Sequence, residues 1–398
     1  MSAANLRRIR HYSEKTLGLK DYFDDCGDGR IQPRRPASDL VWALLASQLL
    51  RDPSFHATEA LVHAAPHSTI QVHSQFCDDT LAYFTERVDP QPTRSALVGV
   101  LHRAKRNKAF QEDPYIGLAI DGTTVGRCTE SSCSMCRPHR HADGQATVYL
   151  HHFAMVSVVG THLSLPFDVE PYGPNDSEYA AGQRLLKRAH AALGSRFADY
   201  LVVDAGYASS PFLHLARELH LPVLARLKDN LPELSGEVER CFGHRRPHRV
   251  TNHDGNRVEL WDSSDFGPWE TLDWKSVRAL RYREITPDGE IVAEAQWLTD
   301  LPAREVGTLS LFKMARSRWE IENQGFNDCK SRQGIEHLCH HEPRSMLICW
   351  LLTLLALVIG RLFRIRYLHR GNHPAVTAIE LVRLLRISLG RVRRIHSP

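Results

Sequence analysis

Short apolar runs alternate with helical stretches in the middle of the chain, and this alternation limits the possible folds more than any other feature. A helical pattern of apolar positions covers 178–193, directly after the capping pair Asp176-Ser177, and a second covers 211–220. Runs of strand length cover 115–120, 147–159, 162–169, 200–203 and 222–227. Strands that alternate with amphipathic helices predict an α/β fold, in which a mixed sheet is flanked by helices.

The segments on either side of this α/β core have different patterns. Residues 1–110 show apolar positions at helical spacing and no competing strand pattern, so this region is predicted to be helical. Residues 231–300 alternate with a period of two, which predicts a β-rich insertion that ends in a hairpin. Helix is expected again over 308–332. We therefore divide the chain into five parts: 1–110, 111–230, 231–300, 301–345 and 346–398.

The region from 346 to 359 consists of fourteen nearly uninterrupted apolar residues. A helix that spans a bilayer needs about 20, so this segment is predicted to be a buried core helix and not a membrane anchor. The start of the chain has basic residues without a following apolar stretch, which is unlike a secretory signal. We therefore expect a protein of the cytoplasm that does not contact membranes.

Positive charge gathers at the C-terminal end. Residues 361–398 hold nine arginines and one acidic residue, Glu380, although the whole chain has a net charge of only +4. Arginine outnumbers lysine 41 to 9, and planar guanidinium groups suit pairs of phosphate oxygens. The basic tail is therefore a candidate contact for a polyanion such as nucleic acid. The alternative is an ordinary solvated face.

Three acidic residues are candidates for a metal site. Asp121 and Asp204 each follow a strand of buried type, so their side chains are expected to gather at one edge of the sheet. Glu322 lies four residues after Arg318 in the helix expected at 308–332, on the same face. Three carboxylates can hold two Mg²⁺ ions and so support phosphoryl transfer. Alternatively, each aspartate is a turn former or a helix cap, and Glu322 forms a surface ion pair with Arg318.

The sequence around these acids resembles a known family. Three blocks are similar, in this order, to the signatures of bacterial insertion-sequence transposases of the DDE type: Ala119-Ile-Asp121-Gly-Thr, Val203-Asp204-Ala-Gly-Tyr207 and Arg318-Trp-Glu-Ile-Glu322-Asn. The nearest subgroup is the cut-and-paste transposases, which have an RNase H-like catalytic domain with a β-strand insertion between the second Asp and the Glu. Here 117 residues separate Asp204 from Glu322, enough for that insertion. The resemblance covers roughly residues 115–335.

This resemblance implies a fold, an activity and partners. The fold would be an RNase H-like mixed sheet with flanking helices, with 111–230 and 301–345 in the catalytic domain and 1–110 as a helical DNA-binding region. The protein would bind the terminal inverted repeats of an insertion sequence. It would hydrolyse a phosphodiester with two Mg²⁺ ions, for which Mn²⁺ can substitute, and join the freed 3′-hydroxyl to target DNA. It would act as a homodimer when bound to DNA, in the bacterial cytoplasm at the nucleoid.

The same resemblance implies roles for individual residues. Asp121, Asp204 and Glu322 would be the catalytic acids and the Mg²⁺ ligands. Arg318 would hold a DNA phosphate, and Lys330 is the candidate for a second contact with DNA. In some relatives a tryptophan of the β insertion stacks on a flipped base, and the sequence offers four candidates without selecting one: Trp261, Trp269, Trp274 and Trp297.

Two positions depart from the family motif. The place of its tyrosine holds Ala315, and the place of its lysine holds Cys329, with Lys330 one residue late. In a regular helix at roughly 100° per residue, Lys330 would lie about 80° around from Glu322 and would reach the same phosphate only by bending its long side chain. Two alternatives therefore stay open: a catalytically silent DNA-binding protein derived from a transposase, and an RNase H-like nuclease that cuts without joining.

A cysteine-rich loop is a candidate for a second metal site. Cys128, Cys133 and Cys136 lie close to His139 and His141 in a polar stretch of the chain. Free cysteines usually prefer burial, and nine cysteines at irregular spacing do not suggest a disulfide framework. We therefore expect one structural Zn²⁺ bound by the three thiols and one histidine, assigned here to His139. The alternative is a surface loop without metal.

Overall fold

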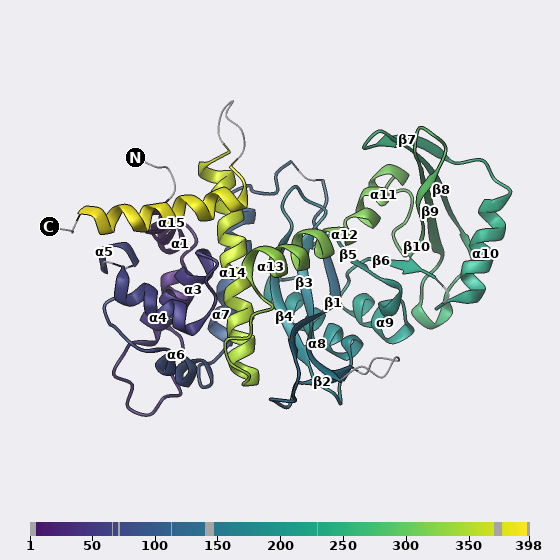
Figure 1. Ribbon diagram of the computed structural model, residues 1–398. Coiled ribbons are helices and arrows are strands. Elements are labelled where there is room, and N and C mark those ends of the chain that lie inside the picture. Colours follow the sequence, from purple (N-terminus) through teal and green to yellow (C-terminus); the bar gives the residue numbers. More distant parts are fainter. Residues whose placement is uncertain are drawn as a thin grey trace.

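A ten-stranded mixed sheet runs through most of the computed structural model (Figure 1). The structure describes residues 5–65, 67–70, 72–112, 114–139, 147–228, 230–369 and 376–395. The strands follow the order β2-β3-β1-β5-β6-β10-β9-β8-β7, and β4 also pairs with β3. Their bounds are β1 Gly117–Cys128, β2 Arg137–His139, β3 Val148–Val159, β4 Leu165–Tyr172, β5 Tyr200–Val203, β6 Val223–Leu227, β7 Arg249–His253, β8 Asn256–Phe266, β9 Val277–Ile285 and β10 Ile291–Thr299.

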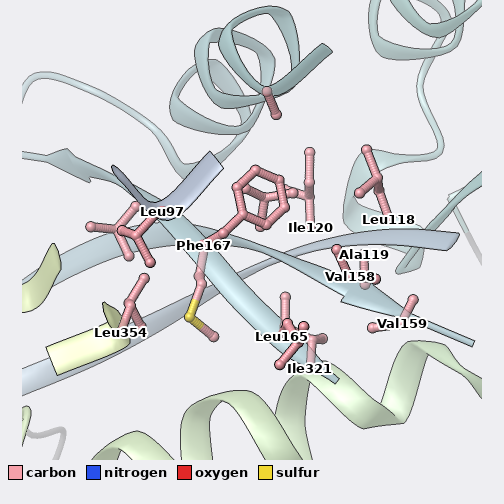
Figure 2. Packing of buried hydrophobic residues seen from close by; sticks show 14 of the residues in the cluster. Leu97, Leu118, Ala119, Ile120, Val158, Val159, Leu165, Phe167, Ile321 and Leu354 are labelled. Carbon is pink, nitrogen blue, oxygen red and sulfur yellow. The ribbon is translucent and has the colours of Figure 1, made fainter. Parts of the chain in front are cut away.

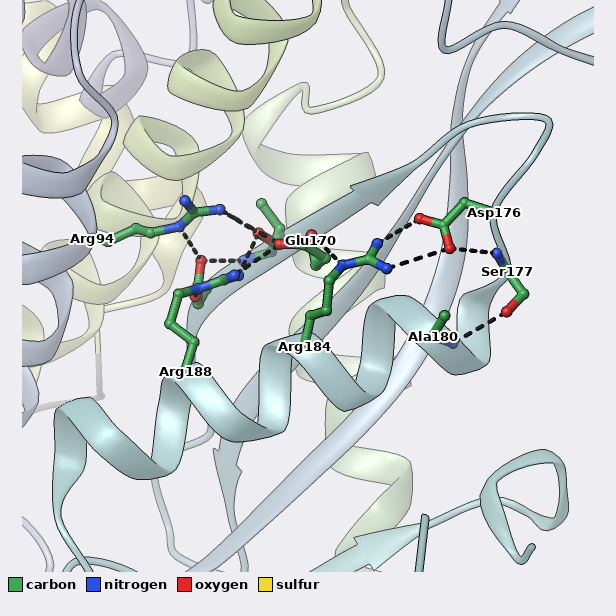
Figure 3. A network of polar contacts seen from close by, with 9 residues as sticks. Arg94, Glu170, Asp176, Ser177, Ala180, Arg184 and Arg188 are labelled. Carbon is green, nitrogen blue, oxygen red and sulfur yellow. Dashed lines mark hydrogen bonds and ion pairs between the residues drawn. The ribbon is translucent and has the colours of Figure 1, made fainter. Parts of the chain in front are cut away.

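The first half of the sheet has the expected RNase H-like arrangement. Strands β1, β3 and β4 form an antiparallel unit, and β5 and β6 continue the sheet parallel to β1. Helices α8 (Glu178–Leu193) and α9 (Ser210–Glu218) make the crossovers that parallel strands need. Helix α8 begins where the sequence predicts, because the Ser177 hydroxyl accepts a hydrogen bond from the Ala180 backbone N–H at 3.1 Å (Figure 3). The predicted fold class, a mixed sheet with flanking helices, is confirmed.

Strand β1 is longer than the sequence indicates. The predicted strand ended at Asp121, but β1 continues to Cys128, so Asp121 lies inside the strand. The reason is its partner, since β3 is equally long and pairs with β1 along its whole length, with one bulge at Gly126. Asp204 directly follows β5, as predicted.

The region between β6 and the later helices is not entirely β-structure. It opens with helix α10 (Pro232–Gly243), which the period-two pattern did not predict, because only Val238 and Phe242 of this helix are buried. Strands β7 to β10 then form the expected antiparallel series. Since β10 pairs with β6, the insertion strands extend the central sheet instead of forming a separate one (Figure 1).

Helices cover the other end of the sheet. The N-terminal region is helical, as predicted, with α1 Leu6–Lys15, α2 Leu19–Asp24, α3 Ala37–Leu49, α4 Phe55–Ala64, α5 His67–Ile70, α6 Asp78–Thr85 and α7 Gln91–Arg106. The long helix α14 (Pro343–Tyr367) stands between these helices and β4 (Figure 1). Helix α15 (Ala378–Ile395) lies across the N-terminal helices, where the guanidinium of Arg386 donates to the carbonyl of Leu50 at 2.8 Å.

Helix α14 has 25 residues and is therefore longer than the fourteen-residue apolar run indicates. Within the described ranges it is the one helix that is long and apolar enough to cross a bilayer, so length alone does not decide its role. Burial does, because 89% of its most apolar window is covered by the rest of the protein. Its buried side chains include Leu351, Leu355 and Ile359. The predicted core helix is thus supported by packing, and the argument from length was wrong.

Apolar side chains fill both faces of the first half of the sheet. Figure 2 shows Ile120 and Phe167 on one face of the sheet, and Leu165 and Ile321 on the other. All four are fully buried, and burial of an aliphatic or aromatic side chain of this size contributes about 1.5–3 kcal/mol. Leu165 and Phe167 point to opposite faces although they are two residues apart, because the pairing of β4 with β3 is irregular between them.

A network of arginines and acids joins the N-terminal helices to the sheet (Figure 3). Arg94 of α7 and Arg188 of α8 both bond Asp168 of β4, at 3.0 and 2.6 Å. Arg188 and Arg184 also bond Glu170, each at 2.8 Å. Asp168 is buried, so the loss of one partner would leave a buried charge without compensation. The network therefore fixes α7 and α8 relative to β4.

Candidate active site

The two aspartates lie on neighbouring parallel strands. Ile120 of β1 pairs with Val203 of β5, and Asp121 and Asp204 are the next residues along each chain segment. Neighbouring strands are about 4.8 Å apart, so the register brings the two acids together although 83 positions separate them. Lys228, just after β6, has its Nζ 3.9 Å from Asp204 Oδ1.

Glu322 is joined to this pair through an arginine. The Nη1 atom of Arg318 is 3.3 Å from Asp121 Oδ2 and 2.8 Å from Glu322 Oε1. Because both oxygens contact one nitrogen, they are at most about 6 Å apart. The side chain of Arg318 is only 7% exposed, whereas that of Glu322 is 41% exposed. The carboxylate of Glu322 is therefore open to solvent. The buried positive charge of Arg318 compensates the negative charges of Asp121 and Glu322.

A π-helical turn carries Glu322. The predicted helix is in fact a series, with α11 Thr308–Arg316, α12 Arg318–Glu320, the π-helical segment η3 Ile321–Phe326 and α13 Asn327–Gln333. Gly325 of this turn packs so closely on the sheet that a Cβ atom there would lie 2.8 Å from Met155 Cε. Met155 of β3 is the direct partner of Asp121 in β1. The turn therefore packs the helix onto the sheet beside Asp121, and π-turns are frequent at functional sites.

The π-turn also changes where the later side chains lie. It adds one residue to the helix, so the eighth residue after Glu322 takes about the place that the seventh has in a regular α-helix. This removes the reason to expect Lys330 turned away from Glu322. Cys329 is 1% exposed and Ala315 is fully buried, so neither faces solvent. Lys330 is partly exposed, with its Nζ 3.9 Å from Glu336 Oε1.

The Asp121 carboxyl has a strongly shifted pKa. Burial raises its pKa from 3.8 to about 7, and the charges of Glu178 and Glu322 add to the rise. The charge of Arg318 and the backbone N–H of Gly122, which donates to Asp121 Oδ1 at 2.9 Å, act in the opposite direction. A shift of this size beside further acids is typical of a functional site.

A fourth carboxylate, which was not predicted from the sequence, lies beside Asp121. Glu178 is the first residue of α8, and a Cβ atom added to Gly122 would lie 2.1 Å from its Oε2. The hydroxyl of Tyr172 donates to the same oxygen at 3.2 Å. In the sequence, the only signal was the place of Glu178 after the Ser177 cap, where an acid is common because it interacts favourably with the helix dipole.

Two arginines lie within electrostatic reach of the acids. Burial lowers the pKa of Arg226 in β6, and the charges of Asp204 and Glu322 oppose this shift, so these acids are within electrostatic reach of Arg226. Within the described part of the chain, the Nε atoms of Arg226 and Arg318 have no hydrogen-bond partner. Both Nε atoms are buried, so neither is open to a phosphate oxygen in this conformation.

The four tryptophans of the insertion differ in exposure. Trp261, Trp274 and Trp297 are buried. Trp269 is half-buried and packs edge to face on Trp274, with ring centroids 5.8 Å apart. Trp269 therefore has the most accessible ring of the four.

The cysteine-rich loop contains a compact group of possible metal ligands. The Sγ atoms of Cys133 and Cys136 are 3.7 Å apart. The Nε2 atom of His151 is 3.2 Å from Cys133 Sγ and 3.4 Å from Cys136 Sγ. All nine cysteines lie in described ranges and are free thiols.

The histidine in this group corrects the prediction from sequence. His139 lies in β2 and is exposed, and the close group of ligand atoms contains His151 of β3 in its place. The loop folds back along β3, since β2 pairs with β3, and this pairing brings His151 to the thiols from outside the loop. His141 lies outside the described residues.

Two more possible ligands border the group. Cys128 ends β1, and its Sγ is 4.0 Å from Nε2 of His341. Ser132 Oγ is hydrogen-bonded with His341 Nδ1 at 2.9 Å. Burial raises the pKa of the Cys128 thiol, and the charge of Cys136 adds to the rise. Burial acts in the same way on Cys136, but hydrogen bonds with its neighbours outweigh it and leave the pKa of that thiol below its usual value.

Three comparisons relate the chain to known proteins, and only the family match bears on its identity. No curated protein matches the chain in sequence. A solved structure, the cryo-EM structure of a piggyBac transposase synaptic complex with hairpin DNA, is similar with a TM-score of 0.44 and 10% sequence identity, over 99% of this chain and 81% of that chain. A family model described as a transposase DDE domain matches residues 112–359. Since this match covers more than half of the 398 residues, the chain belongs to the DDE transposase family.

Proposed function

We propose that this protein is the transposase of an insertion sequence, which binds terminal inverted repeats, cuts DNA by two-metal phosphodiester hydrolysis and joins the freed 3′-hydroxyl to target DNA. One observation carries the proposal. Asp121 and Glu322 are 201 positions apart and bond the same nitrogen of Arg318, with Asp204 next to Asp121 in the sheet register.

The three acids are suited to hold divalent cations. Carboxylate oxygens are the ligands that Mg²⁺ prefers, and Mn²⁺ accepts the same set. Asp121, Asp204 and Glu322 would bind the ions, which supply a nucleophile at neutral pH and stabilise the leaving oxygen. A bound cation would favour the ionised form of Asp121 and so oppose the rise in its pKa that burial causes.

Arg318 acts in this proposal as a positioning residue. Its guanidinium holds Asp121 and Glu322 in one geometry, and a direct contact with DNA would first require it to leave Glu322. The phosphate contacts would instead come from groups nearer to solvent. Lys228 is exposed and lies 3.9 Å from Asp204, and Lys330 is partly exposed and follows Glu322 in the chain. Each can interact with a phosphate as a point charge.

DNA is the partner that this chemistry requires. The N-terminal helices and the basic tail would supply additional contacts with the inverted repeats and the target. Cutting and joining two ends of one element requires two active sites, so we propose a homodimer on DNA. We place its action at the nucleoid in the bacterial cytoplasm.

The two alternatives make different predictions. A silent DNA-binding descendant has no need for three acids that meet at one site, and their geometry counts against it. An RNase H-like nuclease would use the same acids, so only the products of the reaction distinguish it from a transposase.

The test uses the full chain with a DNA fragment that carries the repeats flanking its gene. We expect Mg²⁺-dependent cleavage at the repeat ends and joined products when target DNA is added. Asp121→Asn and Glu322→Gln should each abolish cleavage while DNA binding is retained. The matched control is Glu320→Gln, since Glu320 lines a separate cleft and accepts a hydrogen bond from the Gly160 N–H that Gln can also accept. Cleavage without joining would favour the nuclease, and full activity of both acid variants would refute the catalytic assignment.

A further inference from the structure

The thiols and imidazole around Cys133 are already spaced as zinc ligands. In a tetrahedral site with Zn–S of about 2.3 Å and Zn–N of about 2.0 Å, two sulfurs lie about 3.8 Å apart and a sulfur and a nitrogen about 3.5 Å apart. The observed separations are 3.7 Å between the sulfurs of Cys133 and Cys136, and 3.2 and 3.4 Å from these sulfurs to His151 Nε2. One ion can therefore contact all three atoms with only small side-chain movements.

The surroundings of the group also need an explanation. His151 is fully buried in β3 and directs its Nε2 at two sulfurs, which are weak hydrogen-bond partners. Cys133 and Cys136 are separated by two residues in a tight turn, with the Cys136 N–H donating to the Cys133 carbonyl at 3.2 Å. A Cys-x2-Cys turn with a third and a fourth ligand from elsewhere is the usual arrangement of a structural zinc site.

Cys128 is the candidate for the fourth ligand, and its Sγ lies outside the set of ligand atoms that are within 4.8 Å of one another. It ends the strand that pairs with His151's strand, and its thiol interacts electrostatically with that of Cys136. His341 Nε2 lies 4.0 Å beyond it, and Nδ1 of His341 is already engaged with Ser132. We propose that Cys128, Cys133, Cys136 and His151 bind one Zn²⁺ ion in a closed structural site, with His341 next to it. This site is separate from the acids and does not depend on the proposed DNA chemistry.

The position of the site gives it a mechanical role. Its ligands come from the end of β1, the following loop and β3, so a bound ion ties these three segments together. Asp121 is seven residues before Cys128 on β1. Gly126, between them, has a positive φ of 60°, and a Cβ atom there would lie 2.4 Å from Leu338 Cδ1. Leu338 lies in the segment that follows the helix carrying Glu322. The ion would thus stiffen two of the three segments that carry the proposed catalytic acids, β1 with Asp121 and the helix with Glu322.

The first experiment measures metal in the full-length wild-type protein, purified without chelators. We expect about one zinc per chain by elemental analysis. X-ray absorption should give about three sulfur neighbours near 2.3 Å and one nitrogen neighbour near 2.0 Å. Protein without zinc, a shell of oxygen ligands, or a Cys133–Cys136 disulfide in protein purified under reducing conditions would each overturn the proposal. This measurement needs no variant and so does not depend on whether a variant folds.

Variants then identify the ligands. Cys133→Ser and His151→Ala should lose the zinc, and Cys128→Ser should lose it or bind it weakly enough for a mild chelator to remove it. The matched controls are Cys77→Ser, an exposed thiol, and His139→Ala, the histidine expected from sequence. Both controls should keep the full zinc content. Retention of zinc in His151→Ala, or its loss in His139→Ala, would refute this ligand set, and loss in His341→Ala with retention in Cys128→Ser would refute the fourth ligand.

Discussion

The carboxylate of Glu178 lies directly against Gly122, at the place that a side chain of residue 122 would occupy. A Cβ atom added there would be 2.1 Å from both Cδ and Oε2 of Glu178. Gly122 follows Asp121, and its backbone N–H donates to Asp121 Oδ1. The close approach therefore places a fourth carboxylate beside Asp121, which is the most buried of the three acids Asp121, Asp204 and Glu322.

We expect Gly122→Ala to impair catalysis more than stability. The added methyl group would displace the flexible end of Glu178, which costs little, but it would move a charge away from Asp121. A displacement of about 1 Å near reacting groups can lower a rate about a hundredfold. The measurement is Mg²⁺-dependent cleavage together with urea unfolding. Gly236→Ala is the control, because nothing lies within 4 Å of a Cβ atom there, and it should leave cleavage unchanged.

Periodic features of the sequence predicted much of this fold. The apolar spacing and the Ser177 cap predicted helix α8 with the same first and last residues that the structure shows. The runs before Asp121 and Asp204 located two neighbouring parallel strands, because buried parallel strands are continuously apolar. These features are local, so a single sequence contains them.

The features that were missed depend on tertiary contacts. The extension of β1 past Asp121 depends on pairing with β3, and the π-turn at Glu322 depends on close packing of Gly325 against Met155. His151 could not be chosen as a ligand, because its distance from Cys133 is set by the pairing of β2 with β3. The sequence therefore indicated the kind of chemistry better than the complete set of residues.

Asp121 should make the stability of the metal-free protein depend on pH. The pKa of its carboxyl is about 7 in the folded protein and 3.8 ordinarily, so between these values the folded state binds a proton that the unfolded chain has lost. The free energy of unfolding therefore falls as pH rises from about 4 to about 7, by up to about 4 kcal/mol from this group. Asp121→Asn removes this contribution.

Urea unfolding in a chelator, across this pH range, measures the effect. Wild type and Asp121→Asn should have similar stability near pH 4, and the variant should be more stable by a few kcal/mol at pH 8. The difference between the two proteins isolates Asp121 from histidines that titrate in the same range. Equal stability of the two proteins at pH 8 would mean that burial does not raise the pKa of the Asp121 carboxyl.

Loss of the Arg318 side chain should destabilise the metal-free protein. Its buried guanidinium compensates both Asp121 and Glu322, and breaking a buried pair costs about 3–5 kcal/mol. We expect Arg318→Ala to lose about this much stability without metal and to regain part of it when Mg²⁺ is added, because the cation then takes over the compensation. Thermal unfolding with and without Mg²⁺ measures both effects. Arg332→Ala is the control, since the side chain of Arg332 is 45% exposed and its partner Asp328 keeps a second bond to Arg361. This variant should lose less than about 1 kcal/mol.

The basic tail requires a test by substitution and not by truncation. Removal of 383–398 would also delete Arg386, which bonds the carbonyl of Leu50 and the carboxylate of Asp52 at 2.8 Å each, so truncation would weaken the docking of α15. Replacing Arg383, which is exposed, together with Arg391, Arg393 and Arg394 by Gln removes four charges and keeps Arg386 with its bonds to Leu50 and Asp52. If the tail contacts DNA, each lost phosphate contact should reduce the slope of log affinity against log salt by about 0.9. An unchanged slope in a folded quadruple variant would identify the tail as a solvated face, whereas Arg386→Gln alone should lower the unfolding temperature and leave the slope unaltered.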